Sequence, residues 1–411
     1  MKACIICPNF KLSNIFRLPR RIIFELSKGL IDHNLEVVII SDKIKNSSLS
    51  EEIIMGIKVK RINKISTLLS STPHQIIDEI KHENPDLIFW LIGTTTFLRP
   101  FKINDIKIPI IGIYTSPIYN FLDFVTVGID EILRSIRTLW THLLGLITPK
   151  ILIKNALNSK NFDKIIVVSK NTRSKLREIG VNKKKIILLR VGITDEDLSF
   201  ESPKKIREVK QEFRINDDEF IVTYFGSPLT IRGTDTLVKA FYSFNECVPK
   251  SRLFILSRID HDYEKKYEIL LKKLCKRYGV LNSVFIISKY LDKSYLKSLL
   301  QISDIIVLPF KLVISDTPLV VLETLALGKA LITTNVNGIS EIVSDGRGIL
   351  IPPNDHIFLS ETLKKVYNNS DGICSLSSSA RQFMMFVYPK WNDVCVQLLK
   401  ILNKIINNGK L

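Results

Sequence analysis

Long apolar runs are absent from this sequence of 411 residues. No stretch reaches the roughly 18 uninterrupted apolar residues that a transmembrane helix requires. A signal peptide is missing as well, because Met1–Ala3 opens directly into a strand pattern. These two absences argue against a membrane-spanning or exported protein, and we expect a cytoplasmic one.

Cysteine is also scarce, with six residues scattered through the chain. Cys4 and Cys7 alone form a C-x-x-C pair, and no second pair offers further metal ligands. In a strand over Ala3–Cys7 the two side chains would face opposite sides of the sheet. Core packing therefore accounts for them better than a redox or zinc site. We expect neither a metal nor a bound cofactor.

Acidic residues are fewer than basic ones, 41 against 59 lysines and arginines, which leaves a net charge of +18. About +11 of it lies in the first 200 residues and about +7 in the remainder, so no basic tail stands out. Such a balance favours anionic partners, namely nucleotide diphosphates, acidic lipid surfaces or nucleic acid. Nucleic acid is the weakest of the three, because the chain has no aromatic-interleaved basic segment, zinc-finger spacing or RNA-binding signature. We expect no nucleic-acid partner.

Strand and helix patterns alternate along the whole chain, which favours an α/β fold with parallel sheets. Strands are expected at Lys2–Cys7, Glu36–Ile40, Asp86–Ile92, Ile108–Tyr114, Lys164–Val168, Ile186–Arg190, Glu219–Phe225, Arg252–Ser257, Val284–Ile287, Ile305–Leu308 and Leu331–Thr334. A polar, acidic stretch from Thr194 to Asp218 interrupts the pattern. The chain is long enough for two domains, and the pattern predicts two Rossmann-like domains facing a central cleft.

Glu323 is the most informative single residue. It lies in a run that reads as one short helix, with Thr317 as N-cap, Pro318 at the first helical position and Gly328 as the stop. Its neighbours on the helix surface are all apolar: Leu319, Val320, Ala326 and Leu327. A carboxylate on such a face needs a polar partner from outside, such as a pair of ligand hydroxyls. The alternative is a solvated glutamate on an edge helix.

A second candidate site follows the first strand of the second half. The strand ends at Gly226, a loop begins with Ser227, and Arg232 and Gly233 open a helix. This arrangement would place backbone N–H groups and one guanidinium together, as a phosphate group requires. The alternative is a solvated arginine beside a turn.

From Phe220 to about Ile351 the chain resembles the C-terminal domain of retaining GT-B glycosyltransferases of family 4. The family pattern has two glutamates eight positions apart, then a helix ending in glycine. This chain matches the second glutamate at Glu323 and the helix stop at Gly328. The match continues in the loop of residues 337–343 and the turn of residues 345–348. The first glutamate is replaced by Ser315, with Asp316 beside it.

The resemblance implies a GT-B fold with an acceptor-binding domain over residues 1–196 and a nucleotide-sugar-binding domain over residues 197–385. The last segment, residues 386–411, would form a helix that crosses back to the first domain. The implied reaction moves a hexose from a nucleotide diphosphate sugar to a hydroxyl acceptor, with retention and without a metal.

The family roles transfer to matching positions. Glu323 would hold the ribose hydroxyls, and Asp316 or Ser315 would touch the donor sugar. The implied diphosphate site combines Arg232 with the loop glycines and the start of the Glu323 helix: Gly226, Ser227, Gly233, Pro318, Leu319 and Val320. Arg232, Asp316 and Glu323 are thus the predicted catalytic residues. Two rival classes stay open: a catalytically silent GT-B partner subunit, and a GT-B epimerase or phosphorylase.

The first half departs from the family pattern. The family's Gly-Gly loop is replaced by residues 8–14, no histidine follows Ile111–Tyr114, and Val191–Thr194 stands where the family has Asn-Gly-x-Asp. Residues 15–24 instead join three arginines to aromatics: Arg17, Arg20 and Arg21 with Phe16 and Phe24. Three arginines cannot be buried together, so this segment is expected to face an anionic membrane surface.

A second apolar stretch, from Phe121 to Ile147, has helical spacing with Arg134 and Arg137 alongside, and it either joins the core or contacts lipid. These features predict a polyprenyl-linked or other lipid-linked glycan as acceptor. They also predict a peripheral position on the cytoplasmic face of the membrane.

Two other features are set aside. Asp260-His261-Asp262 resembles a metal-binding D-x-D motif, but it precedes a lysine-rich helix, and helix capping is the simpler account. His142 lies in an apolar run without a carboxylate at dyad spacing, so a satisfied or interfacial histidine is the simpler account there.

Overall fold

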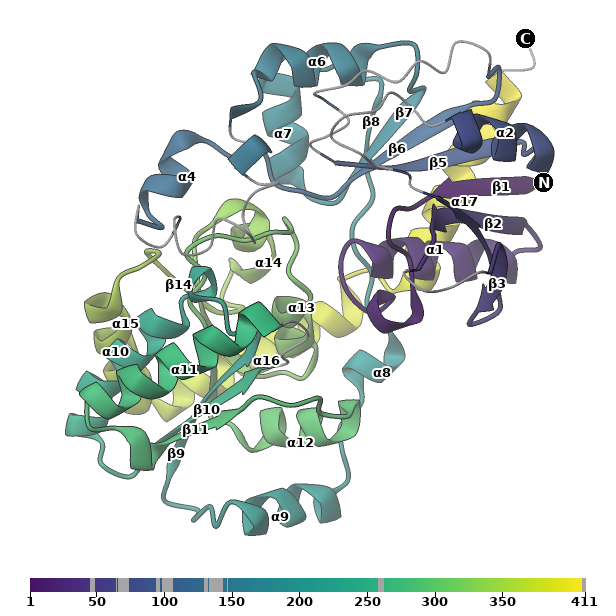
Figure 1. Cartoon of the computed structure of the whole chain (residues 1–411). Helices are drawn as coiled ribbons and strands as arrows, with labels where there is room; N and C mark the ends of the chain where they lie inside the picture. The colour runs from purple at the N-terminus through teal and green to yellow at the C-terminus, as the bar shows by residue number, and fades with distance from the viewer. Residues whose placement is uncertain are drawn as a thin grey trace.

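The structure is a computed structural model, which describes residues 1–44, 49–63, 65, 74–93, 97, 106–128, 132, 143–145, 147–257 and 262–408. Figure 1 shows two lobes, with the N-terminal half of the chain in the upper one and the second half in the lower one. Each lobe is an α/β domain built on its own sheet. The predicted pair of Rossmann-like domains is confirmed.

In the described residues, the sheet of the first domain has eight strands in the order β3-β4-β2-β1-β5-β6-β7-β8. The strands are β1 (Lys2–Ile6), β2 (Glu36–Asp42), β3 (Glu51–Ile54), β4 (Ile57–Ile62), β5 (Leu87–Ile92), β6 (Ile110–Tyr114), β7 (Lys164–Val167) and β8 (Ile186–Leu188). Its helices include α1 (Arg20–Asp32), α2 (His74–Glu83), α4 (Phe121–Val125), α6 (Lys150–Asn158) and α7 (Lys170–Glu178). Among the strands that the structure describes here, only β3 pairs antiparallel, through a hairpin with β4 that the strand prediction missed.

The second domain has a six-stranded, all-parallel sheet in the order β11-β10-β9-β12-β13-β14. The strands are β9 (Phe220–Gly226), β10 (Ser251–Ser257), β11 (Val284–Ile287), β12 (Ile305–Leu308), β13 (Ala330–Thr334) and β14 (Ile349–Ile351). The helices are α9 (Pro203–Glu212), α10 (Thr234–Cys247), α11 (Asp262–Arg277), α12 (Lys293–Ile302), α13 (Leu319–Ala326), α14 (Ser340–Val343), α15 (His356–Tyr367) and α16 (Ser370–Phe386).

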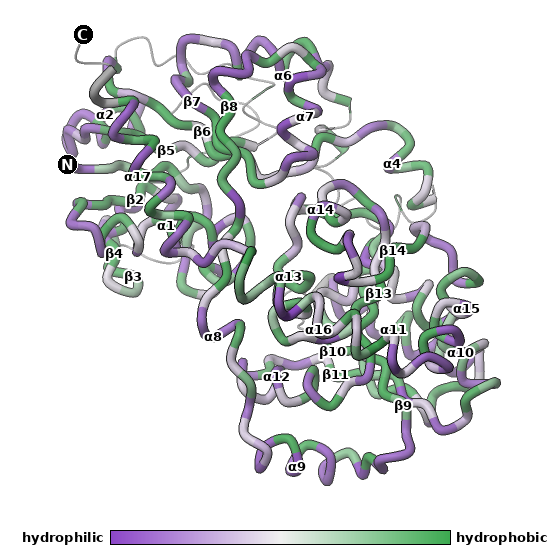
Figure 2. The backbone as a smooth tube through the Cα atoms, turned by 180° about the vertical axis from the view of Figure 1, so that it is seen from behind, coloured by the Kyte–Doolittle hydropathy of each residue, from purple (hydrophilic) through white to green (hydrophobic). Residues whose placement is uncertain are grey.

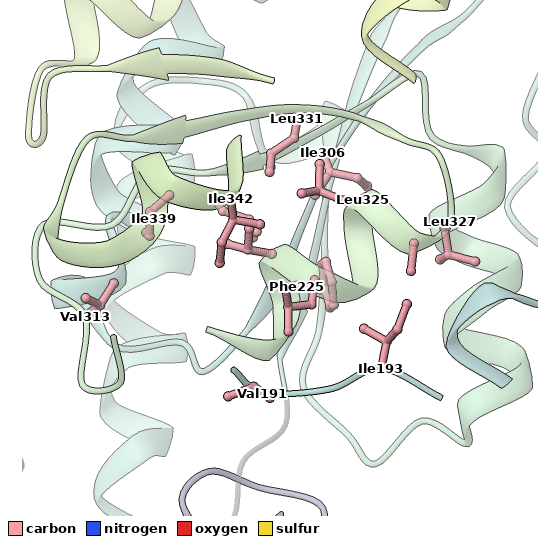
Figure 3. Packing of buried hydrophobic residues seen from close by; sticks show 14 of the residues in the cluster. Val191, Ile193, Phe225, Ile306, Val313, Leu325, Leu327, Leu331, Ile339 and Ile342 are labelled. Carbon is pink, nitrogen blue, oxygen red and sulfur yellow. The ribbon is translucent and has the colours of Figure 1, made fainter. Parts of the chain in front are cut away.

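Both sheets are covered by helices, so their central strands read as continuous apolar runs. All four residues of β12 are fully buried, and Ala3–Ile6 of β1 are at most 1% exposed. In Figure 2 hydrophobic colour follows β6 and β8, whereas α8 (Asp195–Leu198), between the domains, is hydrophilic. Figure 3 shows part of the main cluster, in which Val191 and Ile193 from the crossover join Leu325 and Leu327 of the α13 region.

The chain crosses between the domains twice, at residues 191–198 and again near residue 390. The two crossings touch: Ile193 forms a β-bridge with Lys390, and a side chain on Gly192 would collide with the backbone of Trp391. The final helix, α17 (Trp391–Asn408), packs on α1, where Cys395 lies so close to Gly29 that no side chain fits there. Within the described part of the chain, no helix is long and apolar enough to cross a membrane.

Candidate functional site

Glu323 lies on α13, the helix that follows β12 after a loop of residues 309–318, on the side of the second domain that faces the first. The helix begins one residue later than predicted. Pro318 is the N-cap, with extended backbone angles, while Thr317 is buried before it and caps nothing. Gly328 ends the helix in the left-handed conformation (φ +61°), as expected for a C-terminal stop.

The Glu323 side chain keeps 30% exposure, and its partner comes from the other domain. Nη1 of Arg21, on α1, lies 3.6 Å from Oε1 of Glu323. Burial raises the pKa of Glu323 above its ordinary value, and the Arg21 guanidinium opposes that rise. Helix spacing predicted only apolar neighbours for Glu323. It could not reveal Arg21, because Arg21 belongs to a different helix.

Arg21 is buried, which contradicts the expectation that it faces a membrane. Besides Glu323, its guanidinium pairs with Asp197 of α8 at 3.1 Å and with Glu25 of α1 at 3.6 Å. These carboxylates remove the desolvation penalty on which the membrane expectation rested. Phe24, expected to be exposed, is 3% exposed and belongs to the core. Arg20 donates a hydrogen bond to the carbonyl of Pro8 at 3.1 Å.

The predicted phosphate loop lies between β9 and α10. Gly226 ends β9 at φ +142°, and the hydroxyl of Tyr224 fixes the next turn by donating to the carbonyl of Ser227 at 2.6 Å. Gly233 precedes α10 at φ +78°, and a Cβ there would come within 1.7 Å of the carbonyl oxygen of Pro309. This glycine is therefore required both by its backbone angle and by the close approach of Pro309, the residue that follows β12.

Arg232 projects from this loop with an incomplete set of partners. Its guanidinium lies over the Phe310 ring at 5.3 Å. Among the described residues no carboxylate forms an ion pair with it, and its buried Nε has no hydrogen-bond partner. Burial lowers the pKa of Arg232, although Tyr224 and Tyr119 oppose this. A desolvated cation without an anion is a favourable site for a charged ligand such as a phosphate.

Ser315 and Asp316 have contrasting environments. The Ser315 hydroxyl is buried without a hydrogen-bond partner in the described part of the structure. Asp316 is fully buried and holds the two domains together. Its carboxylate accepts from the first-domain side chains of Ser169, Thr172 (2.6 Å) and Asn171 (3.4 Å), and from the backbone N–H of Gly338 (3.1 Å). The hydroxyl of Ser315 is thus more available to a ligand than the carboxylate of Asp316.

A further carboxylate from the second domain contacts the N-terminus of α7, the helix whose first residues also contact Asp316. Glu341 accepts hydrogen bonds from the backbone N–H groups of Lys170 (2.9 Å) and Asn171, in the first turn of α7. Helix N-termini favour such anions because their first N–H groups lack partners within the helix. Sequence reasoning placed Glu341 in a family-like loop but gave no indication of this contact, because its partners lie about 170 residues earlier in the chain.

Lys311 was also missed. It follows β12, and its backbone N–H donates to the carbonyl of Ile231 in the phosphate loop at 3.0 Å. Its ammonium pairs with Asp235 of α10 at 2.8 Å. Lys311 therefore ties the phosphate loop to α10, whereas Nε of Arg232 has no hydrogen-bond partner among the described residues. The available signal in the sequence was a lysine three residues after a buried strand, together with an aspartate at the start of a helix that could pair with it.

The first domain packs directly on the phosphate loop. Tyr119 donates its hydroxyl hydrogen bond to the carbonyl of Val313 at 2.8 Å. Tyr119 and Phe124 form an apolar cluster with Leu229 and Ile231 of the loop. Residues from both domains thus surround the position of Arg232.

One group of potential metal ligands is present in the described residues: Glu79, His82 and Glu83. The ammonium of Lys60 lies among them, 2.9 Å from Glu79 and 2.5 Å from Glu83, so a lysine already supplies the positive charge. The thiols of Cys4 and Cys7 are fully buried, and burial raises the pKa of each to about 12. His142, Asp260, His261 and most of the stretch from Ile129 to Leu143, Arg134 and Arg137 included, lie outside the described residues.

Each domain matches a separate family model. Residues 205–383 match the family described as glycosyl transferases group 1, and residues 20–197 match glycosyltransferase family 4. An uncharacterised glycosyltransferase of Methanocaldococcus jannaschii is 22% identical over 250 residues, which are 60% of this chain and 60% of that protein. The matched region thus spans less than two thirds of the relative.

Solved structures share the fold over nearly the whole chain. Sucrose-phosphate synthase from Thermosynechococcus elongatus superposes with a TM-score of 0.75 at 17% identity, covering 99% of each chain. A glycosyltransferase from Rickettsia africae gives 0.71 at 16% identity, again covering 99% of each chain. HepE of Anabaena, solved with UDP, gives 0.72 at 15% identity and covers 98% of this chain and 100% of its own. It has also been solved with UDP-glucose.

These identities establish the fold alone, whereas the two family models account for both domains. The chain thus has the GT-B fold, with a first domain of the glycosyltransferase family 4 type and a second domain of the glycosyl transferases group 1 type.

Proposed function

We propose that this protein transfers a hexose from a nucleotide diphosphate sugar to a hydroxyl acceptor, with retention at the anomeric carbon. The observation that carries the proposal is Arg232, a desolvated guanidinium without a carboxylate partner among the described residues, beside a glycine turn that no other residue fits. A diphosphate would complete its interactions. The fold neighbour from Anabaena, solved with UDP and UDP-glucose, supports a donor of this class.

In the proposed mechanism, the donor is held at its two ends. Glu323 accepts hydrogen bonds from the ribose hydroxyls, and Arg232 contacts the diphosphate. The backbone N–H groups of Leu319 and Val320 at the start of α13 add positive potential. The sugar occupies the space beside Ser315, whose hydroxyl has no partner in the described structure. Asp316, the other predicted contact, acts on the sugar only through the position of its neighbours, because its carboxylate is engaged between the domains.

During transfer, the bond between the anomeric carbon and the diphosphate oxygen breaks, and a bond to the acceptor oxygen forms on the same face of the sugar. The acceptor proton passes to the departing diphosphate oxygen. Negative charge grows on the diphosphate as the bond breaks, and Arg232 stabilises it there. No metal is required in this scheme, since the guanidinium and the helix start carry the counter-charge.

Calorimetric titration tests the donor assignment. UDP, GDP, ADP and TDP and their hexose conjugates are titrated into the purified chain, and one of these nucleotides should bind. Turnover is then followed as release of the nucleotide diphosphate in the presence of acceptor, and the anomeric configuration of the product is read by NMR. No binding of any nucleotide would contradict the proposal.

We further propose a lipid-linked glycan as acceptor, presented at an anionic membrane surface. The support is a set of apolar side chains that are exposed on the first domain, on α4, just before α6 and on α6 itself. They are Phe121, Leu122, Val125, Ile147, Ile151 and Leu152. Lys150 and Lys160 are exposed on α6 and directly after it. Exposed apolar side chains next to lysines are typical of surfaces that contact anionic lipid.

Co-sedimentation with anionic and neutral vesicles tests this surface. The double variant Phe121→Gln, Leu122→Gln should lose vesicle binding, and raising the salt should weaken binding of the parent as the screening length falls below about 8 Å. Ile53→Gln with Met55→Gln is the matched control, because these residues are also exposed and apolar but lie on the β3–β4 hairpin instead of on α4. A parent that stays in the supernatant at low salt with anionic vesicles would exclude the lipid-linked acceptor.

One observation favours a second candidate function. Ser315 stands where the family has its first glutamate, and a hydroxyl cannot supply the charge of a carboxylate. A catalytically silent partner subunit that still binds the nucleotide would fit this loss. Nucleotide binding without any turnover in the presence of lipid-linked acceptors would favour this alternative.

A further inference from the structure

We propose that Arg21, a residue of the first domain, positions the ribose-binding carboxylate of the second domain. The proposal rests on the ribose role of Glu323 proposed above. Nη1 of Arg21 lies 3.6 Å from Oε1 of Glu323, across the gap between α1 and α13. Donor affinity then depends on both domains, although the predicted donor residues all lie in the second.

Arg21 is held in place independently of Glu323. Its Nη2 donates to Asp197 at 3.1 Å, and Asp197 is itself held by the backbone and hydroxyl of Thr194. Glu25, one helical turn along α1, lies 3.6 Å from Nε of Arg21. With only 6% of the residue exposed, the guanidinium has little freedom to turn away. The contact with Glu323 is therefore imposed by the surroundings of Arg21.

The separation of 3.6 Å is too long for a hydrogen bond and short enough for strong attraction at a partly buried site. In the described structure the Glu323 carboxylate accepts no hydrogen bond from the protein. Both of its oxygens thus keep lone pairs for ribose hydroxyls, while Arg21 favours the ionised form and fixes the direction of the carboxylate. A direct bidentate pair would instead have competed with the ribose.

Other charges around Glu323 cannot replace this contact. Lys293 of α12 is committed to Glu196 at 2.6 Å and to Asp197 at 3.2 Å. Lys297, also on α12, donates to the backbone carbonyl and hydroxyl of Ser199. Arg21 is the cation within salt-bridge distance of Glu323 in the described part of the chain.

The test compares two ligands that differ only in the ribose hydroxyls. The probe is whichever of UDP, GDP and ADP the parent binds most tightly, and its 2′,3′-dideoxy form is the second ligand. Dissociation constants are measured by calorimetry for the parent, Glu323→Gln, Arg21→Gln, Arg21→Lys and Arg20→Gln. Arg20→Gln is the matched control, because Arg20 is the neighbouring arginine and its guanidinium donates to Pro8 instead.

We expect Glu323→Gln to weaken binding of the ribonucleotide about tenfold and Arg21→Gln to weaken it about fivefold, with little change for the dideoxy form. Arg21→Lys should restore part of the loss, since it keeps the charge. Arg20→Gln should bind like the parent. The double variant Arg21→Gln, Glu323→Gln should be no weaker than Glu323→Gln, because Arg21 acts through Glu323.

The failures are distinguishable. If Glu323→Gln loses ribose discrimination and Arg21→Gln keeps it, the role of Arg21 is wrong and the ribose role of Glu323 stands. If Glu323→Gln also keeps discrimination, both are wrong. Equal weakening of both ligands by Arg21→Gln would show a structural effect only. If Arg21→Gln does not fold, Arg21→Lys decides: its discrimination must lie between those of the parent and Glu323→Gln, and a value equal to the parent's overturns the proposal.

Discussion

Two carboxylates of one segment, Asp316 and Glu323, lie seven residues apart and have opposite surroundings. Asp316 is fully buried, and four donors from two domains contact its oxygens. Glu323 keeps 30% of its side chain exposed and has one long ion pair, to Arg21. Both were predicted to contact the donor, yet only Glu323 has acceptor capacity left.

The difference shows how a structural carboxylate can be told from one available to a ligand. A buried carboxylate needs several donors to offset its desolvation, and Asp316 has them within the protein. Among the described residues Glu323 has no such donor, and the neighbouring charge of Arg21 favours its ionised form. Proximity to a family motif therefore does not decide the role of a residue, whereas the count of its hydrogen-bond donors does.

A third carboxylate, Glu83, extends the comparison to a group whose donors are ammonium ions. The ammonium groups of Lys2 and Lys60 lie 2.6 and 2.5 Å from it. Glu83→Gln should cost about 3 kcal/mol of unfolding free energy, because the ammonium of buried Lys60 then loses its closest counter-charge. Urea unfolding measures this. Glu36→Gln is the control, since Glu36 also pairs with Lys2 but is 63% exposed.

The same contribution should depend on pH. Burial alone would raise the pKa of Glu83, but Lys2 and Lys60 lower it from 4.5 to about 2. A depressed carboxylate pKa stabilises the fold fully above the unfolded value and loses that effect as the pH falls from 4.5 toward 2. The difference in stability between the parent and Glu83→Gln should therefore shrink across this window. A constant difference would contradict the assignment.

The second expected effect concerns Asp316. Asp316→Ala leaves the hydroxyls of Ser169 and Thr172 and the N–H of Gly338 without their acceptor, and it should cost about 2 to 3 kcal/mol. Because these donors span both domains, small-angle scattering should also report a looser arrangement of the domains. Ser315→Ala, at the preceding position, removes a hydroxyl that has no partner among the described residues and should leave stability unchanged. Equal stability of the two variants would show that the hydrogen bonds of Asp316 do not stabilise the fold. Asp316 would then no longer differ from Glu323 as a structural carboxylate.

The third test uses Arg232 and concerns its proposed role in stabilising charge on the departing diphosphate. Arg232→Ala should lower turnover about 100-fold and donor affinity much less, if the guanidinium acts on charge that develops as the sugar bond breaks. Steady-state kinetics separates the two effects. Lys311→Ala is the comparison, because that ammonium is committed to Asp235 and should affect the phosphate loop only through its position. Loss of affinity with unchanged turnover would show that Arg232 only holds the ground-state diphosphate.

Much of the fold followed from sequence. Buried strands of a parallel sheet are continuous apolar runs, and Val284–Ile287 and Ile305–Leu308 were predicted with their observed bounds. The β3–β4 hairpin was missed because charged residues interrupt it and its turn, Met55–Gly56, is only two residues long. Both turn residues have positive φ angles, and Met55 is an unusual choice for such a position.

The candidate site was less predictable. Gly233 and Arg232 could be proposed from the sequence because a tight loop and a helix start are local features. Arg21 was misassigned to a membrane surface, because the carboxylates that neutralise it lie on three different helices, two of them far along the chain. The contacts of Asp316 with α7 span about 145 residues. Such pairings depend on how the domains dock, which local periodicity does not encode.

A smaller effect is expected in the pH dependence of nucleotide binding. Burial raises the pKa of Glu323 above 4.5, Arg21 of α1 and Lys293 and Lys297 of α12 oppose this, and Asp197 of α8 adds to it. In the proposed ribose role the ionised form of Glu323 is the acceptor, so affinity should fall about fivefold as the pH drops through this raised pKa. Calorimetry at several pH values measures it. Glu323→Gln should show no such fall, and a parent without it would exclude Glu323 as the titrating group.

The most direct test of the donor site compares nucleotide affinity in the parent and in Glu323→Ala, with thermal unfolding recorded for both. Removing a partly exposed carboxylate leaves little unpaired charge, so the melting temperature should stay close to that of the parent. Affinity for the nucleotide diphosphate should fall about tenfold, because two hydroxyl contacts are lost. Unchanged affinity for every nucleotide that the parent binds would contradict the assignment of the donor site.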